Sequence, residues 1–254
     1  MKLPVSPILV ALICQRTAAH YVFSRLIVNG TISKDFQYVR DVTGNAGTRD
    51  SLWYKAFPIF GAENKNSTCG RGAFPVYNAD TIETATVFAG DDVGLALSGP
   101  FFNGDSQPLI YHEGPGMIFL GKLPEGLKNL SEYDGAGDFF KIGYAGPDSA
   151  TSWSLQQYWA MNATIPVTTP PGKYLLRVEQ FLASSYLGQS QWFVNCAHVE
   201  IVGAGGGRPE GLVKFPGAYH DEDPSVWFRE EGTESGYPKD FMKYVEPKPA
   251  AWTG

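Results

Sequence analysis

The chain has 254 residues, a length that suits one large all-β domain or at most two small ones. Its 20 Lys and Arg residues stand against 26 Asp and Glu residues, which gives a formal net charge of −6, and it has no cluster of basic residues. An acidic chain of this kind argues against nucleic acid and anionic membranes as partners, whereas a neutral polymer sets no charge requirement.

The first residues of the chain form a predicted secretion signal. Lys2 is followed by an apolar run over residues 4–13 and by the small residues Thr17, Ala18 and Ala19. The run is shorter than the roughly 20 residues that a membrane span needs. We therefore expect residues 1–19 to be removed, a secreted mature protein of one domain over residues 20–254, and His20 as its first residue. Cleavage a few residues earlier is the alternative.

The predicted strands are short and are bounded by Gly, Pro, Asn or Asp. No segment of ordinary helix length has a 3.6-residue period, and residues 203–254 indicate an extended segment wrapped over the domain. The pattern predicts an all-β, immunoglobulin- or fibronectin-like β-sandwich with long loops. The predicted strands, in chain order, cover residues 21–28, 36–40, 84–89, 93–97, 116–123, 139–144, 172–181 and 191–202.

Cysteine usage agrees with secretion. Cys14 leaves with the signal, so Cys69 and Cys196 remain, and in an oxidising compartment two cysteines most simply form one disulfide. Four N-x-S/T sequons are candidate glycosylation sites in a secreted chain. They lie at Asn29, Asn66, Asn129 and Asn162.

A histidine at the mature N-terminus is a potential metal chelator. Its amine has a pKa near 8 and loses its proton at little cost, so the amine and the ring of His20 can bind one metal together. A second imidazole would complete a three-nitrogen site that suits Cu(II). His112 precedes a predicted strand and lies on a loop at a sheet end, where functional groups are often placed. Both histidines also have the plainer alternative of no metal role.

The other two histidines of the mature chain have simpler interpretations. His198 lies on a predicted strand, where a solvent-facing or hydrogen-bonded side chain is expected. His220 begins the acidic run His-Asp-Glu-Asp, which could contribute to a carboxylate metal site but is more simply a solvated loop.

Several motifs, in this order, give the mature chain a close resemblance to a known family. The chain is similar to the fungal lytic polysaccharide monooxygenases of auxiliary activity family nine, formerly glycoside hydrolase family sixty-one. The resemblance extends from His20 to Trp252. The motifs that carry it are residues 20–23 (HYVF), 112–115 (HEGP), 139–142 (FFKI), 172–179 (GKYLLRVE), 216–219 (PGAY) and 244–252 (YVEPKPAAW).

The resemblance implies a site and a reaction. The amine and ring of His20 and the ring of His112 would hold one copper ion, and Gln191 would hydrogen-bond oxygen species at that ion. Tyr244 would lie near a flat surface that binds polysaccharide. An external electron donor would reduce the copper, O2 or H2O2 would react with it, and the copper–oxygen species would abstract hydrogen at C1 or C4 of cellulose or a related β-glucan. The resemblance also implies the Cys69–Cys196 disulfide.

Two positions depart from the family pattern near the metal. Phe193 stands where the family has an axial tyrosine, and it offers only apolar surface to that face. Ser184, or Ser185 if the gap falls differently, replaces a histidine that donates a hydrogen bond to copper-bound oxygen. A serine cannot carry a proton near neutral pH as an imidazole can. We count Gln191, Phe193 and Ser184 as the candidate catalytic residues.

Three functions follow as hypotheses. The first is a monomeric, copper-dependent polysaccharide monooxygenase. The second is a secreted copper- or carbohydrate-binding protein with the same fold but little turnover, which Phe193 and Ser184 favour. The third is a hydrolase with paired carboxylates, for which Asp134/Asp138 and Glu230/Glu231 are candidates, although these pairs lie in polar loops with nothing to raise one pKa.

Overall fold

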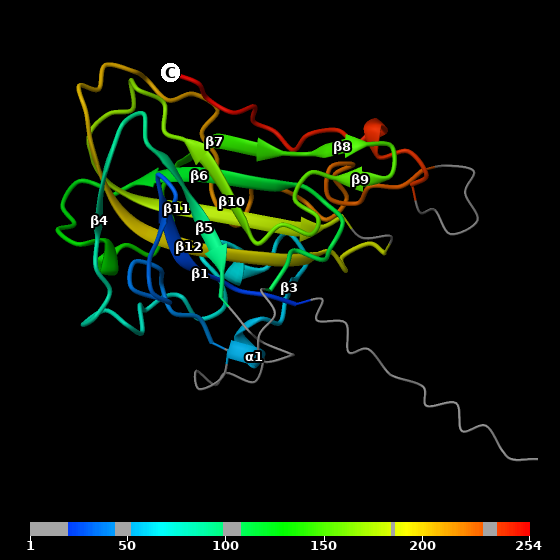
Figure 1. Ribbon diagram of the computed structural model, residues 1–254, viewed down its shortest axis with the longest axis horizontal. Helices are drawn as coiled ribbons and strands as arrows, with labels where there is room; N and C mark the ends of the chain where they lie inside the picture. Colours follow the sequence, from blue (N-terminus) through cyan, green and yellow to red (C-terminus); the bar gives the residue numbers. More distant parts are fainter. Residues whose placement is uncertain (1–19, 44–51, 99–107, 184–185, 231–237) are drawn as a thin grey trace, which may run out of the picture.

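The computed structural model describes residues 20–43, 52–98, 108–183, 186–230 and 238–254. Two β-sheets dominate this part of the chain and pack face to face (Figure 1). The smaller sheet has the strand order β10-β5-β1-β2 and the larger one β3-β12-β11-β6-β7, with β4 added to β12 in parallel. The predicted β-sandwich is confirmed. The strands of the smaller sheet are β1 (Phe23–Val28), β2 (Thr31–Ile32), β5 (Asp92–Leu97) and β10 (Ala160–Thr164).

The larger sheet is built on its two longest strands. β11 (Gly172–Leu182) and β12 (Gln191–Val202) pair antiparallel over their full length, from Gly172 opposite Ile201 to Leu182 opposite Gln191. The remaining strands of this sheet are β3 (Ile59–Phe60), β4 (Ala85–Phe88), β6 (Gly116–Lys122) and β7 (Phe139–Ala145).

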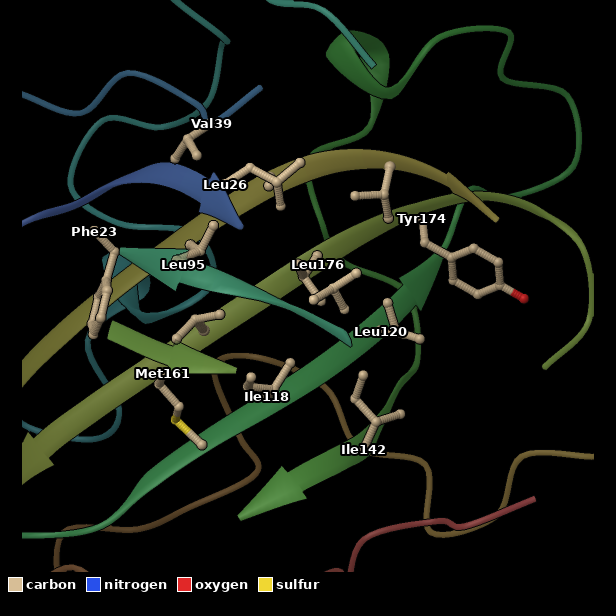
Figure 2. Packing of buried hydrophobic residues seen from close by; sticks show 14 of the residues in the cluster. Phe23, Leu26, Val39, Leu95, Ile118, Leu120, Ile142, Met161, Tyr174 and Leu176 are labelled. Carbon is tan, nitrogen blue, oxygen red and sulfur yellow. The ribbon is translucent and has the colours of Figure 1, made fainter. Parts of the chain in front are cut away.

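Both faces of the larger sheet are buried. The inner face packs on the smaller sheet around Phe23, Leu95, Ile118 and Leu176, as Figure 2 shows. The outer face is covered by the segment after β12, because Phe215 and Tyr219 belong to a second apolar cluster with residues of β6, β11 and β12. A sheet buried on both sides explains why its strands are continuous apolar runs rather than strict alternations.

Among the strands of the two sheets, the prediction is wrong at residues 36–40 and missed β10 and the two-residue strands β2 and β3. Residues 36–40 form no strand: Phe36 has a positive φ of 55°, and the Asn78 side chain donates to the carbonyls of Phe36 and Val39, so this segment bends. The prediction missed β10, whose sequence AMNAT has little β-branched or aromatic content. β10 forms because it pairs with β5 along its whole length.

Regular structure outside the two sheets is short. A hairpin of β8 (Pro147–Ser149) and β9 (Ser152–Trp153) accompanies one four-residue helix, α1 (Leu52–Lys55). The 3-10 turns are η1 (Lys65–Ser67), η2 (Leu130–Glu132) and η3 (Phe241–Lys243). Among the described residues, none of the helices has the length and apolar character to cross a membrane.

A fully buried ion pair lies on the outer face of the larger sheet. Arg177 Nη2 lies 2.6 Å from Glu179 Oε2, and both side chains are inaccessible to solvent. The guanidinium also donates to the carbonyls of Ser67 and Thr68 and lies 3.5 Å from the centre of the Phe215 ring. Arg177 therefore ties η1 and the Phe215 segment to the sheet.

We expect Arg177→Met to lower the free energy of unfolding by about 3–5 kcal/mol, because the change leaves the Glu179 carboxylate buried without its cationic partner. Chemical denaturation measures this loss. The matched control is Lys214→Met, which breaks an exposed 3.9 Å pair with Asp138 and should cost no more than about 1 kcal/mol. Equal losses in the two variants would contradict the role given to Arg177.

Candidate metal centre

One end of the sandwich brings together side chains that are far apart in the sequence. His20 lies three residues before β1, and His112 lies on the loop that enters β6. Gln191 and Phe193 stand at the start of β12, which pairs there with the end of β11. The antiparallel order of the strands therefore places the candidate ligands at one sheet end.

The two histidine rings lie next to one another beside an aromatic wall. Their centroids are 5.7 Å apart, and Phe193 lies 6.2 Å from His20 and 5.4 Å from His112, with the His112 ring stacked on it at 23°. Tyr21 stacks on Phe193 at 4.1 Å, and Phe57 lies 5.1 Å from His20. The structure thus brings together the two predicted ligands and the predicted axial phenylalanine.

Burial favours the neutral form of both imidazoles. It lowers the pKa of His20 from its usual 6.5, an effect that the neighbouring Gln191 side chain opposes. The pKa of His112 falls to about 4, mainly through burial and secondarily through the charge that His20 would carry. A neutral imidazole keeps a lone pair for a metal, so the two rings are in the ligating form without a change of protonation.

One buried ring nitrogen at this end lacks a protein partner. Within the described part of the chain, His112 Nε2 has no hydrogen-bond partner. Ring nitrogens favour Cu(II) at the top of the divalent affinity order. Because a metal–imidazole bond is about 2 Å long in zinc sites, two rings 5.7 Å apart can share one ion. The residues present fit a copper ion.

The His112 loop is fixed by β11 through close backbone contact. Gly114 has a φ of +149°, and a Cβ built there would lie 1.9 Å from the Phe181 carbonyl oxygen. The Gln180 Nε2 donates to the carbonyls of His112 at 3.0 Å and Gly114 at 3.4 Å. The sequence analysis did not identify Gln180. The feature that could have identified it is a polar residue within the apolar run of a central strand.

Tyr244 lies away from any open surface. It is only 9% exposed and packs with Trp153, Phe228 and Phe241, and its hydroxyl donates to the Ser225 carbonyl. A ring buried in this way is not available to stack on a sugar. The position of Ser184 lies outside the described residues, as does Ser185.

The remaining predicted residues fall elsewhere in the fold. Cys69 and Cys196 form the predicted disulfide. His198 is buried and accepts a hydrogen bond from Arg40 Nε at 3.0 Å, while His220 is exposed and pairs with Glu63.

The carboxylates considered as candidates for hydrolysis make other contacts in the structure. Asp134 caps the Ala136 N–H, Asp138 and Lys214 are an exposed pair, and Glu230 pairs with Lys243. Glu231 lies outside the described residues.

Comparisons with known proteins agree on one family. The model of Auxiliary Activity family 9, formerly GH61, matches residues 20–237 and so begins at His20. The chain is 40% identical to AA9 family lytic polysaccharide monooxygenase U of Thermothielavioides terrestris, and 32% identical to monooxygenase C of Malbranchea cinnamomea, each over the whole of both chains. The structure resembles that of CvAA9A with a TM-score of 0.69 at 23% identity, over 92% of this chain and 98% of the other. It also resembles the structure of HiLPMO9B, with a TM-score of 0.67 at 22% identity, over 92% of this chain and 100% of the other.

We expect Gly114→Ala to weaken copper binding and to cost about 1–3 kcal/mol of stability, because the new methyl group overlaps the Phe181 carbonyl and displaces the His112 loop. Calorimetric copper titration and chemical denaturation measure the two effects. Gly126→Ala is the control, since Gly126 has a φ of +93° but no atom within 4 Å of its added Cβ. Copper affinity unchanged in Gly114→Ala would show that this contact does not place His112.

Proposed function

The chain belongs to Auxiliary Activity family 9 and is a copper-dependent lytic polysaccharide monooxygenase, and from that premise we propose that His20 and His112 hold its single copper ion. The observation that supports this most directly is the pair of adjacent imidazoles, one with a buried nitrogen that has no partner among the described residues. The proposed substrate is cellulose or a related β-linked glucan.

The third nitrogen in this proposal is the main-chain amine of His20. It becomes free only when residues 1–19 are removed, and the family match that starts at His20 supports this boundary. The protein is then a secreted monomer with one domain over residues 20–254. The amine has a low intrinsic cost of deprotonation at neutral pH, and with the two rings it gives a three-nitrogen set.

Bound copper would supply one-electron chemistry toward O2 or H2O2 after reduction by an external donor, which leads to hydrogen abstraction at C1 or C4 of the sugar. The chain's own residues enclose the site and orient the oxygen co-substrate. Phe193, in contact with both rings, closes one face of the site with apolar surface. The Gln191 side chain lies beside His20, where it can orient an oxygen co-substrate by hydrogen bonding.

Exposed aromatic residues beside the two ligating segments form a candidate substrate surface. Tyr111 precedes His112 and is 38% exposed, and Tyr158, which is 61% exposed, lies on the segment paired with Ile110. Phe60 is 50% exposed and is the cross-strand partner of Gln191. We call Phe60, Tyr111 and Tyr158 the aromatic rim. It supports binding of a neutral polysaccharide because sugar rings and aromatic rings can bury apolar faces against each other.

N-glycosylation fits three of the four sequons better than the fourth. Asn29, Asn129 and Asn162 are exposed. Asn66 is half-buried in η1. We therefore propose glycans at Asn29, Asn129 and Asn162.

We expect the copper-loaded mature protein, supplied with ascorbate, to release aldonic acids or C4-ketosugars from amorphous cellulose. His20→Ala, or one extra residue before His20, should abolish both tight copper binding and these products, because either change removes a ligand or blocks the amine. Calorimetric titration measures the copper affinity, and mass spectrometry of soluble products measures the cleavage.

The two readouts separate two failures. Tight copper binding that survives His20→Ala would falsify the proposed ligand set. Copper bound by the wild type, but with no oxidised products from any of several glucans, would instead favour a binding protein that has the same fold and little turnover. Neutral products without oxidised ends would indicate a hydrolase.

We expect Phe60→Ala and Tyr158→Ala each to weaken binding to amorphous cellulose by about 2- to 10-fold, which corresponds to about 0.5–1.5 kcal/mol per aromatic contact. Adsorption isotherms measure this change. Phe88→Ala is the control, since Phe88 is 58% exposed but pairs with Val202 at the opposite end of β12. Equal weakening in all three variants would rule out a binding surface specific to the aromatic rim.

A further inference from the structure

Gln180 is a fully buried polar side chain at the end of an apolar row. Tyr174, Leu176 and Val178 precede it on the inner face of β11, and all three belong to the core between the sheets. Gln180 continues this row to the end of the strand that lies beside the candidate metal centre. An amide buried in such a position is costly unless its donor and acceptor groups are paired.

The Gln180 amide is paired with both segments that carry the metal ligands. Its Oε1 accepts a hydrogen bond from the hydroxyl of Tyr21, the residue directly after His20. Its Nε2 donates to the carbonyls of His112 and Gly114, and to that of Phe181 on its own strand. One side chain therefore bridges the His20 segment and the His112 loop.

Tyr21 extends this bridge to the wall of the site. Its ring is 1% exposed and stacks on Phe193 at 4.1 Å and 24°. Phe193 in turn contacts both histidine rings. Tyr21 is thus held by its hydroxyl on one side and by its ring on the other, so its backbone, and with it His20, has a defined position relative to His112.

We propose that Gln180 and Tyr21 are positioning residues that set the separation and orientation of the His20 and His112 rings. This inference rests on the proposed copper site. Neither residue touches the metal; they act through the backbone on each side of it. Loss of such outer contacts at metal sites typically lowers metal affinity 10- to 100-fold.

The test uses Gln180→Met, which keeps an unbranched side chain of similar length without the amide, and Tyr21→Phe, which keeps the stacked ring without the hydroxyl. We expect the dissociation constant for Cu(II) to rise about 10- to 100-fold in Gln180→Met. The copper hyperfine coupling in the electron paramagnetic resonance spectrum should change in both variants. The double variant should add little to Gln180→Met, because the two changes break one shared hydrogen bond.

The matched control is Tyr174→Phe. Tyr174 is also 1% exposed, lies on the same strand, and donates one hydrogen bond at 2.7 Å, to the Pro170 carbonyl away from the metal centre. Tyr174→Phe should lose about as much stability as Tyr21→Phe, yet it should keep the wild-type spectrum and the wild-type affinity for Cu(II).

Wild-type spectrum and affinity in a folded Gln180→Met protein would overturn the proposal. So would an equal spectral change in the Tyr174→Phe control. If the wild-type protein itself failed to bind Cu(II), the proposed copper site would fail instead, and the two outcomes are therefore distinguishable.

Discussion

The pairing of β11 with β12, in a sheet that is buried on both faces, is the constraint on which the rest of the structure depends. These two strands supply Gln180, Gln191 and Phe193 at one end and Cys196 and Arg177 further along. Their register of eleven paired positions leaves little freedom to shift, because a slip by one residue would exchange the two buried faces. The geometry of the candidate metal centre depends on that register.

Several buried Arg, Lys and Gln side chains share one structural task. Each donates to the carbonyl groups of a loop. Arg177 donates to Ser67 and Thr68, and Gln180 to the His112 loop. On β7 of the same sheet, Lys141 donates to the carbonyl of Pro247, and outside the two sheets Arg40 donates to the carbonyls of Leu130 and Tyr133. Long loops with little regular structure are therefore held by donors from the sheets and their neighbours, since buried donors need partners and loop carbonyls supply them.

The sequence predicted the sandwich and most of its long strands, because apolar runs between turn residues depend on local sequence. It could not predict β10, which forms only because β5 offers it an edge, nor the bend at Phe36, which depends on the distant Asn78 side chain. At the site, His20 and His112 followed from nitrogen chemistry and from family motifs. Tyr244 was placed by motif position alone, and its burial depends on packing with Trp153 and Phe228 that no motif encodes.

The residues around Phe193 change how its departure from the family pattern is interpreted. Taken by itself, the residue only removes a phenol oxygen from the axial face. In the structure the nearest stacked ring is Tyr21, whose hydroxyl points to Gln180 rather than toward the histidines. A wall of two stacked aromatic rings therefore backs the site, and the one phenol in that wall serves to fix the backbone beside His20. In the proposed copper site, this hydroxyl group holds the ligand segments in place, the face toward His20 and His112 is apolar, and the chemistry falls to Gln191 and the metal.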